Sequence, residues 1–426
     1  MEVTLLDILD ARETRVQKQQ ELLRKYGKTL ICFTMNIPGP TKATPEIRAA
    51  FKIGNSILHD FFEVVYEEDT SAFTGCEKFY IVNDPPAAAK KKCMMAEESS
   101  PVGRLFDMDV LTPDGKKLSR ETPRKCLICD QDAAICGRSR AHSVEELQAA
   151  TNTLLEDCSL ELVSRLATDA LYAEVKTTPK PGLVDRNNSG SHKDMDIDTF
   201  YQSCAAMSFY FDYCAEAEAA DPKDLFAMLR PLGMEAEENM LEATGGVNTH
   251  KGAIFTMGIA VAAAARCFPD TTPEAILNYC AQMTEGLVKQ DFGGITEPKT
   301  AGERLFVEHG ITGIRGQAEQ GFPAVLNVGL PVLQKGISLG LSSNDAGCAT
   351  LLHLLAVTDD TNMISRSNLS TLREIQSRLQ SLLADDPYPD LSIIEELDKE
   401  FISRNLSPGG TADLLALTYF LHFLNN

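Results

Sequence analysis

The sequence has no long hydrophobic run. Its longest apolar stretch, residues 252–265, is short and rich in alanine, whereas a helix that spans a bilayer needs about 20 apolar residues. The first residues, MEVTLLDILDARETR, are acidic and amphipathic, and they lack the basic start and apolar centre of a secretory signal. We therefore expect no membrane association and a cytoplasmic location. In that compartment the twelve cysteines are expected to be reduced thiols or metal ligands, not disulfides.

Basic residues are also few. The chain has 40 Lys and Arg against 61 Asp and Glu, for a formal net charge of −21, which argues against nonspecific binding of nucleic acid. The deficit is uneven, because residues 1–158 contain 21 basic and 25 acidic residues, a net of −4, and the remainder contains 19 and 36, a net of −17. This shift predicts two fused domains, and 426 residues are too many for one ordinary core.

The first predicted domain, residues 1–157, mixes helical and strand patterns. Apolar spacing over residues 5–26 predicts a helix that stops at Gly27, and another helix is expected over 143–158. Runs rich in β-branched and aromatic residues predict strands at 30–36, 61–66, 79–82 and 103–111. The pattern is typical of a small α/β or α+β domain with a mixed sheet.

The second predicted domain, residues 158–426, has helical spacing almost throughout and no convincing strand. We expect a large all-helical bundle. Its clearest helical segments lie at 197–219, 235–243, 253–268, 273–288, 369–383 and 412–424.

Residues 244–252, TGGVNTHKG, stand directly before an apolar helical run. A helix start offers unpaired N–H groups and a partial positive charge, and glycines let the backbone close on an anion. The segment therefore resembles a phosphate cradle formed by Gly245, Gly246, His250 and Lys251, although it lacks the spacing of a Walker motif. The alternative is an ordinary helix cap made by Asn248 or Thr249.

Four further polar junctions interrupt the helical pattern, at 177–196, 291–306, 359–366 and 407–415. Ordinary helix connections need only a few polar residues, so we expect these loops to gather at one end of the bundle and form a cleft. Cations such as Lys299 and Arg304 beside carboxylates such as Asp360 suit a polyphosphate with Mg²⁺.

Here the sequence resembles a known family. The ordered set KPGLVDRNNSGSHKDM, GGVNTHKGAIF, DFGGITEPKTAGERLF, DTN and SPGGTADLLA, over about residues 160–426, is similar to triphosphoribosyl-dephospho-CoA synthase. The resemblance implies that the ribose 2′-hydroxyl of 3′-dephospho-CoA attacks C1 of the ribose of ATP and that adenine leaves.

The residue types of this domain fit such chemistry. A carboxylate can stabilise an oxocarbenium-like state, and a carboxylate or His can take the hydroxyl proton. On residue type, we assign phosphate binding to Gly245, Gly246, His250 and Lys251, Mg²⁺ binding to Asp359 and Asp360, and acid–base work to Asp185 or Glu297. Asp185 has a purely structural alternative, in which it caps the RNNSG loop.

In the first domain, GRLFDMDVL places two carboxylates, Asp107 and Asp109, on one face of a predicted strand, about 6–7 Å apart. Such a pair can hold Mg²⁺ at a transferring phosphate. The alternative is an exposed strand face with ordinary charges. Lys42 in NIPGPTK and Arg48 on the helix that follows are candidate phosphate contacts, or simple turn and helix-face residues.

CLICDQDAAIC, followed by a histidine, gives Cys126, Cys129, Cys136 and His142, in which the first pair has zinc-knuckle spacing. The alternatives are small buried thiols or a redox pair.

The combination of ARETR, NIPGPTK, GRLFDMDVL and CLICDQDAAICGRSRAHS, over about residues 3–155, resembles the apo-citrate lyase phosphoribosyl-dephospho-CoA transferase family. One departure is Phe106, where Trp is expected. The resemblance implies that a serine of the citrate lyase acyl carrier (gamma) subunit attacks the phosphate nearest the ribose and that pyrophosphate leaves. It also implies metal ligation by Asp107 and Asp109, with Lys42, Arg48 and Arg104 offsetting phosphate charge.

Taken together, these features predict a bifunctional transferase that uses ATP, 3′-dephospho-CoA and Mg²⁺. Two alternatives stay open at this point. One is a helical Mg²⁺-dependent ADP-ribosyl or nucleoside hydrolase, and the other is a non-catalytic zinc-knuckle interaction module on a helical scaffold.

Overall fold

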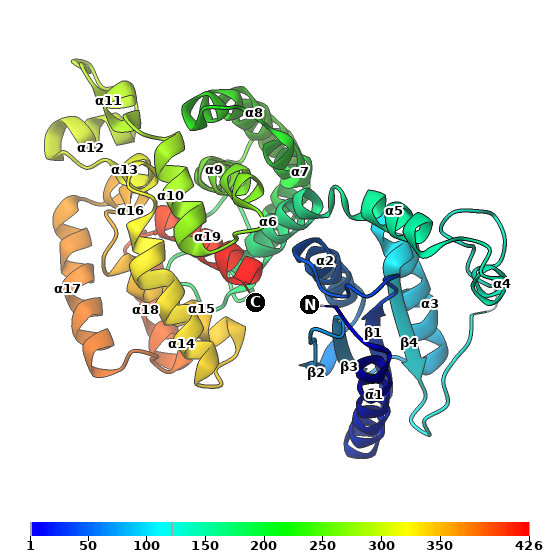
Figure 1. Ribbon diagram of the computed structural model, residues 1–426. Coiled ribbons are helices and arrows are strands. Elements are labelled where there is room, and N and C mark those ends of the chain that lie inside the picture. Colours follow the sequence, from blue (N-terminus) through cyan, green and yellow to red (C-terminus); the bar gives the residue numbers. More distant parts are fainter. Residues whose placement is uncertain (1, 121, 426) are drawn as a thin grey trace. The chain divides into compact units, whose positions relative to one another are not determined.

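The computed structural model describes residues 2–120 and 122–425. Internal contacts divide the chain into two units, Met1–Leu162 and Val163–Asn426 (Figure 1). The functional domain limits expected from the sequence, 1–157 and 158–426, stay a prediction.

Unit 1 contains a four-stranded sheet whose strand order is β2-β3-β1-β4. The strands are β1 (Thr29–Met35), β2 (Val64–Asp69), β3 (Glu77–Val82) and β4 (Phe106–Leu111). The four expected strands are therefore present, but the expectation of a mixed sheet is wrong, because every pairing is antiparallel. Strands that run in the same direction, β1 with β2 and β3 with β4, are each separated by another strand and never pair, so the unit is of the α+β type.

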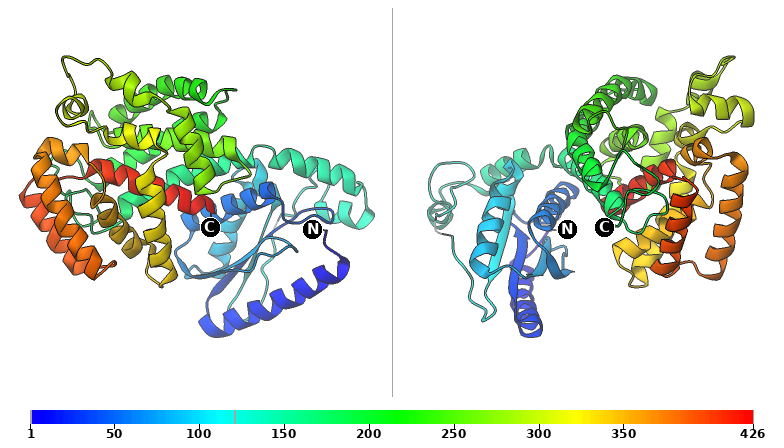
Figure 2. Two further views of the ribbon diagram at one scale, coloured as in Figure 1. Left: turned by 60° about the vertical axis from the view of Figure 1, so that its left-hand side comes forward. Right: turned by 180° about the vertical axis from the view of Figure 1, so that it is seen from behind.

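Helices cover both faces of this sheet (Figures 1 and 2). Adjacent residues of β1 point to opposite faces: Cys32 packs with Leu22 and Leu23 of α1, whereas Phe33 stacks on Phe51 of α2 with ring centroids 4.6 Å apart. The helical elements are α1 (Leu5–Tyr26), α2 (Pro45–Phe61), α3 (Pro86–Glu98), the 3₁₀ turn η1 (Pro101–Leu105), α4 (Ala133–Ser139) and α5 (Val144–Leu155).

Unit 2 is helical, and its described residues contain no strand, as the sequence predicts. A helix that begins before the division, α6 (Cys158–Lys176), leads into it. The others are α7 (Ile197–Glu216), α8 (Pro222–Ala243), α9 (Lys251–Cys267), α10 (Pro273–Met283), α11 (Leu287–Phe292), α12 (Ala301–His309), α13 (Gly313–Glu319), the π-helical turn η2 (Val325–Gly329), α14 (Leu330–Ser338), α15 (Ser343–Leu355), α16 (Thr361–Arg366), α17 (Leu369–Asp385), α18 (Leu391–Ser403) and α19 (Gly409–Asn425).

The central helix of unit 2 is α9, most of whose residues are buried, and α7, α8, α10 and α19 pack around it. Its small residues allow close approach. A side chain at Gly258 would collide with the Tyr210 phenol of α7, which donates a hydrogen bond to the Ile254 carbonyl at 3.0 Å. Within the described ranges, none of the helices combines the length and apolar character needed to span a bilayer.

Candidate active sites

In unit 1 the edge strand β4 presents the two predicted carboxylates. It pairs with β1 so that Asp107 lies opposite Thr34 and Asp109 opposite Cys32. Alternation buries Phe106, Met108 and Val110 and leaves Asp107 exposed and Asp109 half-buried on the other face. The structure therefore brings Asp107 and Asp109 to one face of the sheet, with their carboxylates accessible.

Cations surround this pair. Lys117, on the return segment after β4, forms an ion pair with Asp109, and Arg124 forms one with Glu97 of α3 at 2.9 Å. Desolvation by neighbouring atoms and the negative charge of Asp109 raise the pKa of Asp107, while Lys117 and Arg124 partly offset that rise. Two carboxylates that repel one another in this way are typical of a site that accepts a cation. The sequence analysis assigned no role to Lys117, Arg124 or Glu97.

The predicted phosphate contacts of unit 1 lie in different places. Lys42 donates to the Ile37 carbonyl of its own loop, and burial together with the charge of Arg12 lowers its pKa. Arg104 donates through Nη2 to the carbonyls of Lys125 and Cys126, at 2.9 and 3.1 Å. Since the N–H of Asn36 bonds to the Leu105 carbonyl, the loop bearing Lys42 leaves β1 at the end where β4 begins. This is also the end of β4 that bears Asp107.

Arg48 is exposed on α2. Burial and the charge of Arg48 lower the pKa of Lys52 to about 8. The sequence missed Lys52, and it also missed Arg12, although Arg12 belongs to the ARETR motif. A cavity of about 270 Å³ lies beside the loop that bears Lys42. Its lining includes Ile37, Pro38, Thr41 and Thr44, and Gln148 of α5.

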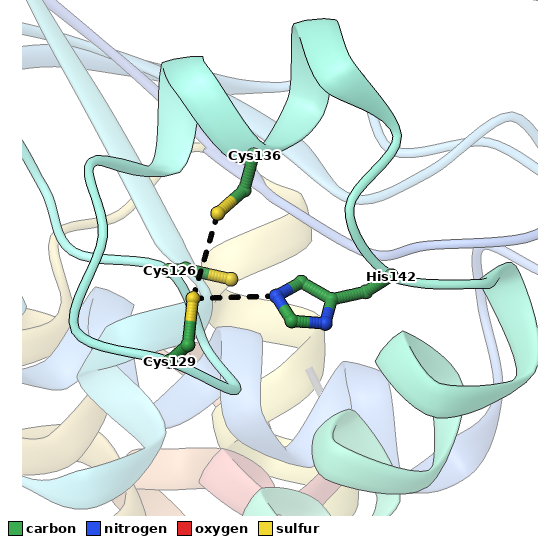
Figure 3. A group of neighbouring side chains, drawn as sticks. All are labelled: Cys126, Cys129, Cys136 and His142. Atoms are coloured by element: carbon green, nitrogen blue, oxygen red, sulfur yellow. Dashed lines mark hydrogen bonds between the residues drawn. The ribbon is translucent and has the colours of Figure 1, made fainter.

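Four side chains converge after β4, as Figure 3 shows. The ligand atoms of Cys126, Cys129, Cys136 and His142 all lie within 4.8 Å of one another. Burial opposes ionisation of Cys126, but the backbone N–H groups of Ile128 and Cys129 bond to its sulfur and lower its pKa. The structure thus brings together all four residues that the sequence suggested as zinc ligands.

In unit 2 the glycine pair of TGGVNTHKG ends α8. Gly245 and Gly246 have φ angles of 67° and 93°, which glycine adopts without strain. Their N–H groups donate to the carbonyls of Glu242 and Leu241 in α8, at 3.3 and 2.7 Å. These two N–H groups are therefore occupied, although the glycines face open space.

The side chains at the start of α9 also differ in accessibility. His250 is 3% exposed, and its Nδ1 lies 2.7 Å from Ser203 Oγ, which also accepts a hydrogen bond from Thr249. Burial and the charge of Lys180 lower the pKa of His250 to about 3, so the ring is neutral. Lys251 is exposed and pairs with Glu237 of α8. No side chain caps α9, so the N–H groups of its first turn have no partner within the helix.

Asp185 organises its own loop. Its carboxylate accepts hydrogen bonds from the backbone N–H groups of Lys180, Asn187 and Asn188, at 2.9, 2.7 and 3.1 Å. The side chain is buried. This is the structural alternative considered from the sequence.

The adjacent residues Asp359 and Asp360 point to different partners. Asp359 forms an ion pair with Arg373 at 2.6 Å. Asp360 is 1% exposed, and it accepts from the Met363 N–H at 2.9 Å and from the N–H and hydroxyl of Thr411 at 2.7 and 2.8 Å. In this arrangement Asp360 joins α16 to α19, and the two carboxylates do not converge on one ion.

Asp413 of α19 lies against the first turn of α9. A side chain added at Gly252 would overlap its carboxylate, whose Cγ would be 2.8 Å from the new Cβ. Burial, then the negative charges of Glu174 and Asp360, raise the pKa of Asp413 well above its usual value. Glu174 itself pairs with the buried Lys180 at 2.6 Å. Asp413 lies in the predicted 407–415 junction, but the sequence analysis assigned it no individual role.

The 291–306 segment supplies three exposed side chains, Glu297, Lys299 and Arg304. Arg304 bonds to the Lys299 carbonyl at 3.4 Å. The segment ends in α12, which packs against α16.

Most of the predicted junctions of unit 2 are linked directly. His192 bonds to Ser407 at 2.9 Å and to Arg366 at 3.1 Å, which joins the 177–196, 359–366 and 407–415 segments. Asp413, which belongs to the 407–415 segment, lies against Gly252 and so links these three segments to the start of α9. The expected gathering of loops is therefore found for these four segments.

Two family models divide the chain between them. The model for apo-citrate lyase phosphoribosyl-dephospho-CoA transferase matches residues 3–158, and the model for ATP:dephospho-CoA triphosphoribosyl transferase matches residues 160–426. The chain is therefore a bifunctional transferase of citrate lyase prosthetic-group synthesis. This result favours the transferase over the hydrolase and the non-catalytic module.

Relatives that match nearly the whole chain, or its larger part, narrow the identification. Protein CitXG of Leuconostoc mesenteroides subsp. cremoris is 35% identical over 98% of this chain and 97% of that protein. Protein CitXG of Haemophilus influenzae is 34% identical over 100% and 97%. A 2-(5''-triphosphoribosyl)-3'-dephosphocoenzyme-A synthase of Klebsiella pneumoniae is 42% identical over 62% of this chain and 91% of its own length. The chain belongs to the CitXG family.

Proposed function

We propose that unit 2 forms 2′-(5-triphosphoribosyl)-3′-dephospho-CoA and that unit 1 transfers it to a serine of the citrate lyase acyl carrier (gamma) subunit. In the first step the 2′-oxygen of dephospho-CoA bonds to C1 of the ATP ribose as the bond to adenine breaks. The hydroxyl proton passes to a base, and adenine takes up a proton as it leaves. Both substrates are metabolites of the cytoplasm, where we place the reaction.

Asp413 is the best-supported proton acceptor of the first step. Its carboxylate lies beside the uncapped start of α9, and its raised pKa makes the ionised carboxylate a stronger base than an ordinary one. Asp185 already accepts three backbone N–H groups and would act by shaping the loop. Glu297, which is exposed, stays an alternative base.

The triphosphate stays intact in this step and needs only an anchor. The first-turn N–H groups of α9 favour an anion, and we assign Lys251 to the same anion because its side chain is exposed at this helix start, where it pairs with Glu237. Gly245 and Gly246 leave the approach open, and His250 would position Thr249 through Ser203. Lys299 and Arg304 would bind the outer phosphates from the exposed 291–306 segment, and Asp359 would contribute to a Mg²⁺ site only after leaving Arg373.

In the second step, the serine oxygen bonds to the phosphorus nearest the ribose, the bond from that phosphorus to the bridging oxygen breaks, and pyrophosphate leaves while the serine proton passes to solvent. Asp107 and Asp109 fit Mg²⁺, since two accessible carboxylates on one strand face leave the remaining positions to phosphate and water. When bound, the ion neutralises charge on the phosphates. Lys42, Arg48 and Arg104 would offset the rest, with Arg124 and Lys117 beside the carboxylates.

The observation that carries the proposal is that each unit, matched by its own family model, contains its own carboxylate site: Asp107 and Asp109 in unit 1 and Asp413 in unit 2. The test is to incubate the purified protein with ATP, dephospho-CoA and Mg²⁺, and to measure free adenine and the mass of the coenzyme product. Acyl carrier subunit is then added and its intact mass recorded. Release of adenine with free ribose triphosphate, and no coenzyme adduct, would refute the first step.

Variants separate the two units. Asp413→Asn should slow product formation by about 10²–10⁴-fold and leave transfer of preformed intermediate unchanged. Asp107→Asn should do the reverse, with a loss of at least about 10²-fold. The matched controls are Asp224→Asn in unit 2 and Asp10→Asn in unit 1, because both residues are exposed. A loss of both steps in either site variant would contradict the assignment.

A further inference from the structure

We propose that Cys126, Cys129, Cys136 and His142 bind one structural Zn²⁺ ion. Cys126 and Cys129 come from a turn, Cys136 from α4 and His142 from the segment after α4, and all four side chains point to a common centre (Figure 3). No other group of three or more His, Cys, Asp or Glu side chains converges in this way among the described residues.

The spacing of the ligand atoms suits a tetrahedral ion. Zn–S bonds of about 2.3 Å and Zn–N bonds of about 2.0 Å place sulfurs roughly 3.8 Å apart and sulfur and nitrogen roughly 3.5 Å apart. The Sγ atoms of Cys129 and Cys136 are 3.5 Å apart, and His142 Nε2 is 3.3 Å from Cys129 Sγ. A small movement outward from one centre would give zinc geometry.

The ligand set also selects the metal and its role. Three thiolates and one imidazole suit Zn²⁺ better than Mg²⁺ or Ca²⁺, which prefer oxygen. Four protein ligands close a tetrahedral site, so the ion has no free position for a substrate. Neither buried core thiols nor a redox pair accounts for the imidazole nitrogen that faces the sulfurs.

The backbone around the cluster is already shaped for an ion. The Cys126 N–H donates to the Gln131 carbonyl and the Ala133 N–H donates to the Arg124 carbonyl, each at 2.8 Å. These bonds close the turn between the first two cysteines and α4. Residues 124–142 form a short segment in which Cys126 and Cys136 are the only buried residues, and a metal would supply the stability that so small a core cannot give.

Two arginines connect residues 124–142, the segment that bears the proposed zinc ligands, with the carboxylate pair of Asp107 and Asp109. Arg104, three residues before Asp107, donates to the Lys125 and Cys126 carbonyls. Arg124 lies two residues before Cys126, and its side chain reaches Glu97. Resting on the proposed function of unit 1, we infer that zinc positions Arg104 and Arg124 beside Asp107 and Asp109 without touching the substrate.

Metal content of the full-length protein tests the site directly. After purification without chelator, mass spectrometry of the metal should find about one zinc per chain, and Cys129→Ser should lose it. Cys267→Ser is the matched control, because Cys267 is a half-buried thiol in unit 2, and it should retain zinc. Wild-type protein without zinc, or a Cys129→Ser variant that keeps it, would overturn the proposal, as would a disulfide in place of free thiols.

Replacement of zinc by Co²⁺ gives a second readout that is independent of activity. The Co²⁺ protein should show the absorption of a tetrahedral thiolate site, and His142→Ala should shift that absorption while keeping the metal. Loss of zinc should slow transfer of preformed intermediate at least about tenfold and leave synthesis of the intermediate unchanged. If zinc is present but its loss leaves transfer unaltered, the positioning role fails while the site itself stands.

Discussion

Glu97 accepts a hydrogen bond from the backbone N–H of Met108, with Oε1 and the nitrogen 2.8 Å apart. Lys90, on the same helix α3, donates to the Met108 carbonyl at 3.0 Å. Because β4 is an edge strand, the outer N–H and C=O of Met108 have no strand partner, and two charged side chains that are 3% and 9% exposed satisfy them. Since Met108 separates Asp107 from Asp109, α3 holds the strand that presents the carboxylates.

Glu97→Gln should destabilise unit 1. The amide can still accept from Met108, but it removes a negative charge that faces Arg120 and Arg124. Leaving those partly buried cations uncompensated should lower the free energy of unfolding by about 2–4 kcal/mol. Urea denaturation of the full chain, followed by hydrogen exchange of β4 amides, measures the change.

The neighbouring Glu98 provides the control. Its side chain is 64% exposed and lies 3.5 Å from Arg120, so Glu98→Gln should change the free energy of unfolding by no more than about 0.5 kcal/mol. Equal effects of the two substitutions would show that burial of Glu97 is not what makes its charge important.

Periodicity predicted most of the fold. The spacing that predicted 5–26 is confirmed by α1, because an amphipathic helix with a capping box needs little from its surroundings. The predicted limits of two helices in unit 2 were wrong. The segment expected at 235–243 is only the end of α8, which begins at Pro222 and continues through Pro231. Tertiary packing there overrides the local cost of proline. The segment expected at 273–288 is divided, because Gly286 adopts a φ of 83°.

The candidate sites were harder to predict than the elements. The sequence placed Asp107 and Asp109 on one face because strand alternation is local. It did not show that the Asp185 oxygens are occupied by the backbone of their own loop, or that Asp360 bonds to Thr411. Such pairings depend on long-range packing. For the same reason, no local signal identified Asp413, because its surroundings are formed by the first turn of α9, which is distant in sequence.

Gly252→Ala should impair the first step. The new methyl would collide with the Asp413 carboxylate, so either the carboxylate or the first turn of α9 must shift. Because an active-site shift of about 1 Å can cost about 10²-fold in rate, we expect a fall of that order in adenine release. The free energy of unfolding should fall by about 1–3 kcal/mol.

Gly233→Ala is the matched control for this change. Gly233 lies inside α8, and an added methyl would make ordinary contacts with Ile254 and Tyr210 at 3.6 Å. Relief of glycine's backbone entropy should leave stability unchanged or raise it by up to about 1 kcal/mol, with normal adenine release. Similar losses in both variants would rule out the collision as the cause.

The buried His250 should make folding sensitive to acid. Its pKa falls from 6.5 to about 3 in the folded chain. Between pH 6.5 and pH 3, the imidazole is therefore protonated in the unfolded state and neutral in the folded state. Stability is fully present above pH 6.5 and should decline below it by up to about 1.4 kcal/mol per pH unit from this group. His250→Asn should lack this contribution. Urea titrations at pH 7.5, 6.5 and 5.5 compare the slopes, and parallel curves would contradict a buried neutral ring.

Asp107→Asn should separate stability from activity. Because desolvation and Asp109 raise the pKa of Asp107, its ionised form is disfavoured by the fold, and this group removes stability as the pH rises through the unfolded pKa. At pH 7.5 the amide should therefore raise the melting temperature slightly while transfer to the acyl carrier subunit is lost, as expected where function requires an unfavourable charge. Added Mg²⁺ should raise the melting temperature of wild-type protein and of Asp10→Asn, but not of Asp107→Asn. A variant that melts earlier than wild type and still gains stability from Mg²⁺ would show that Asp107 supports the fold and does not bind the ion.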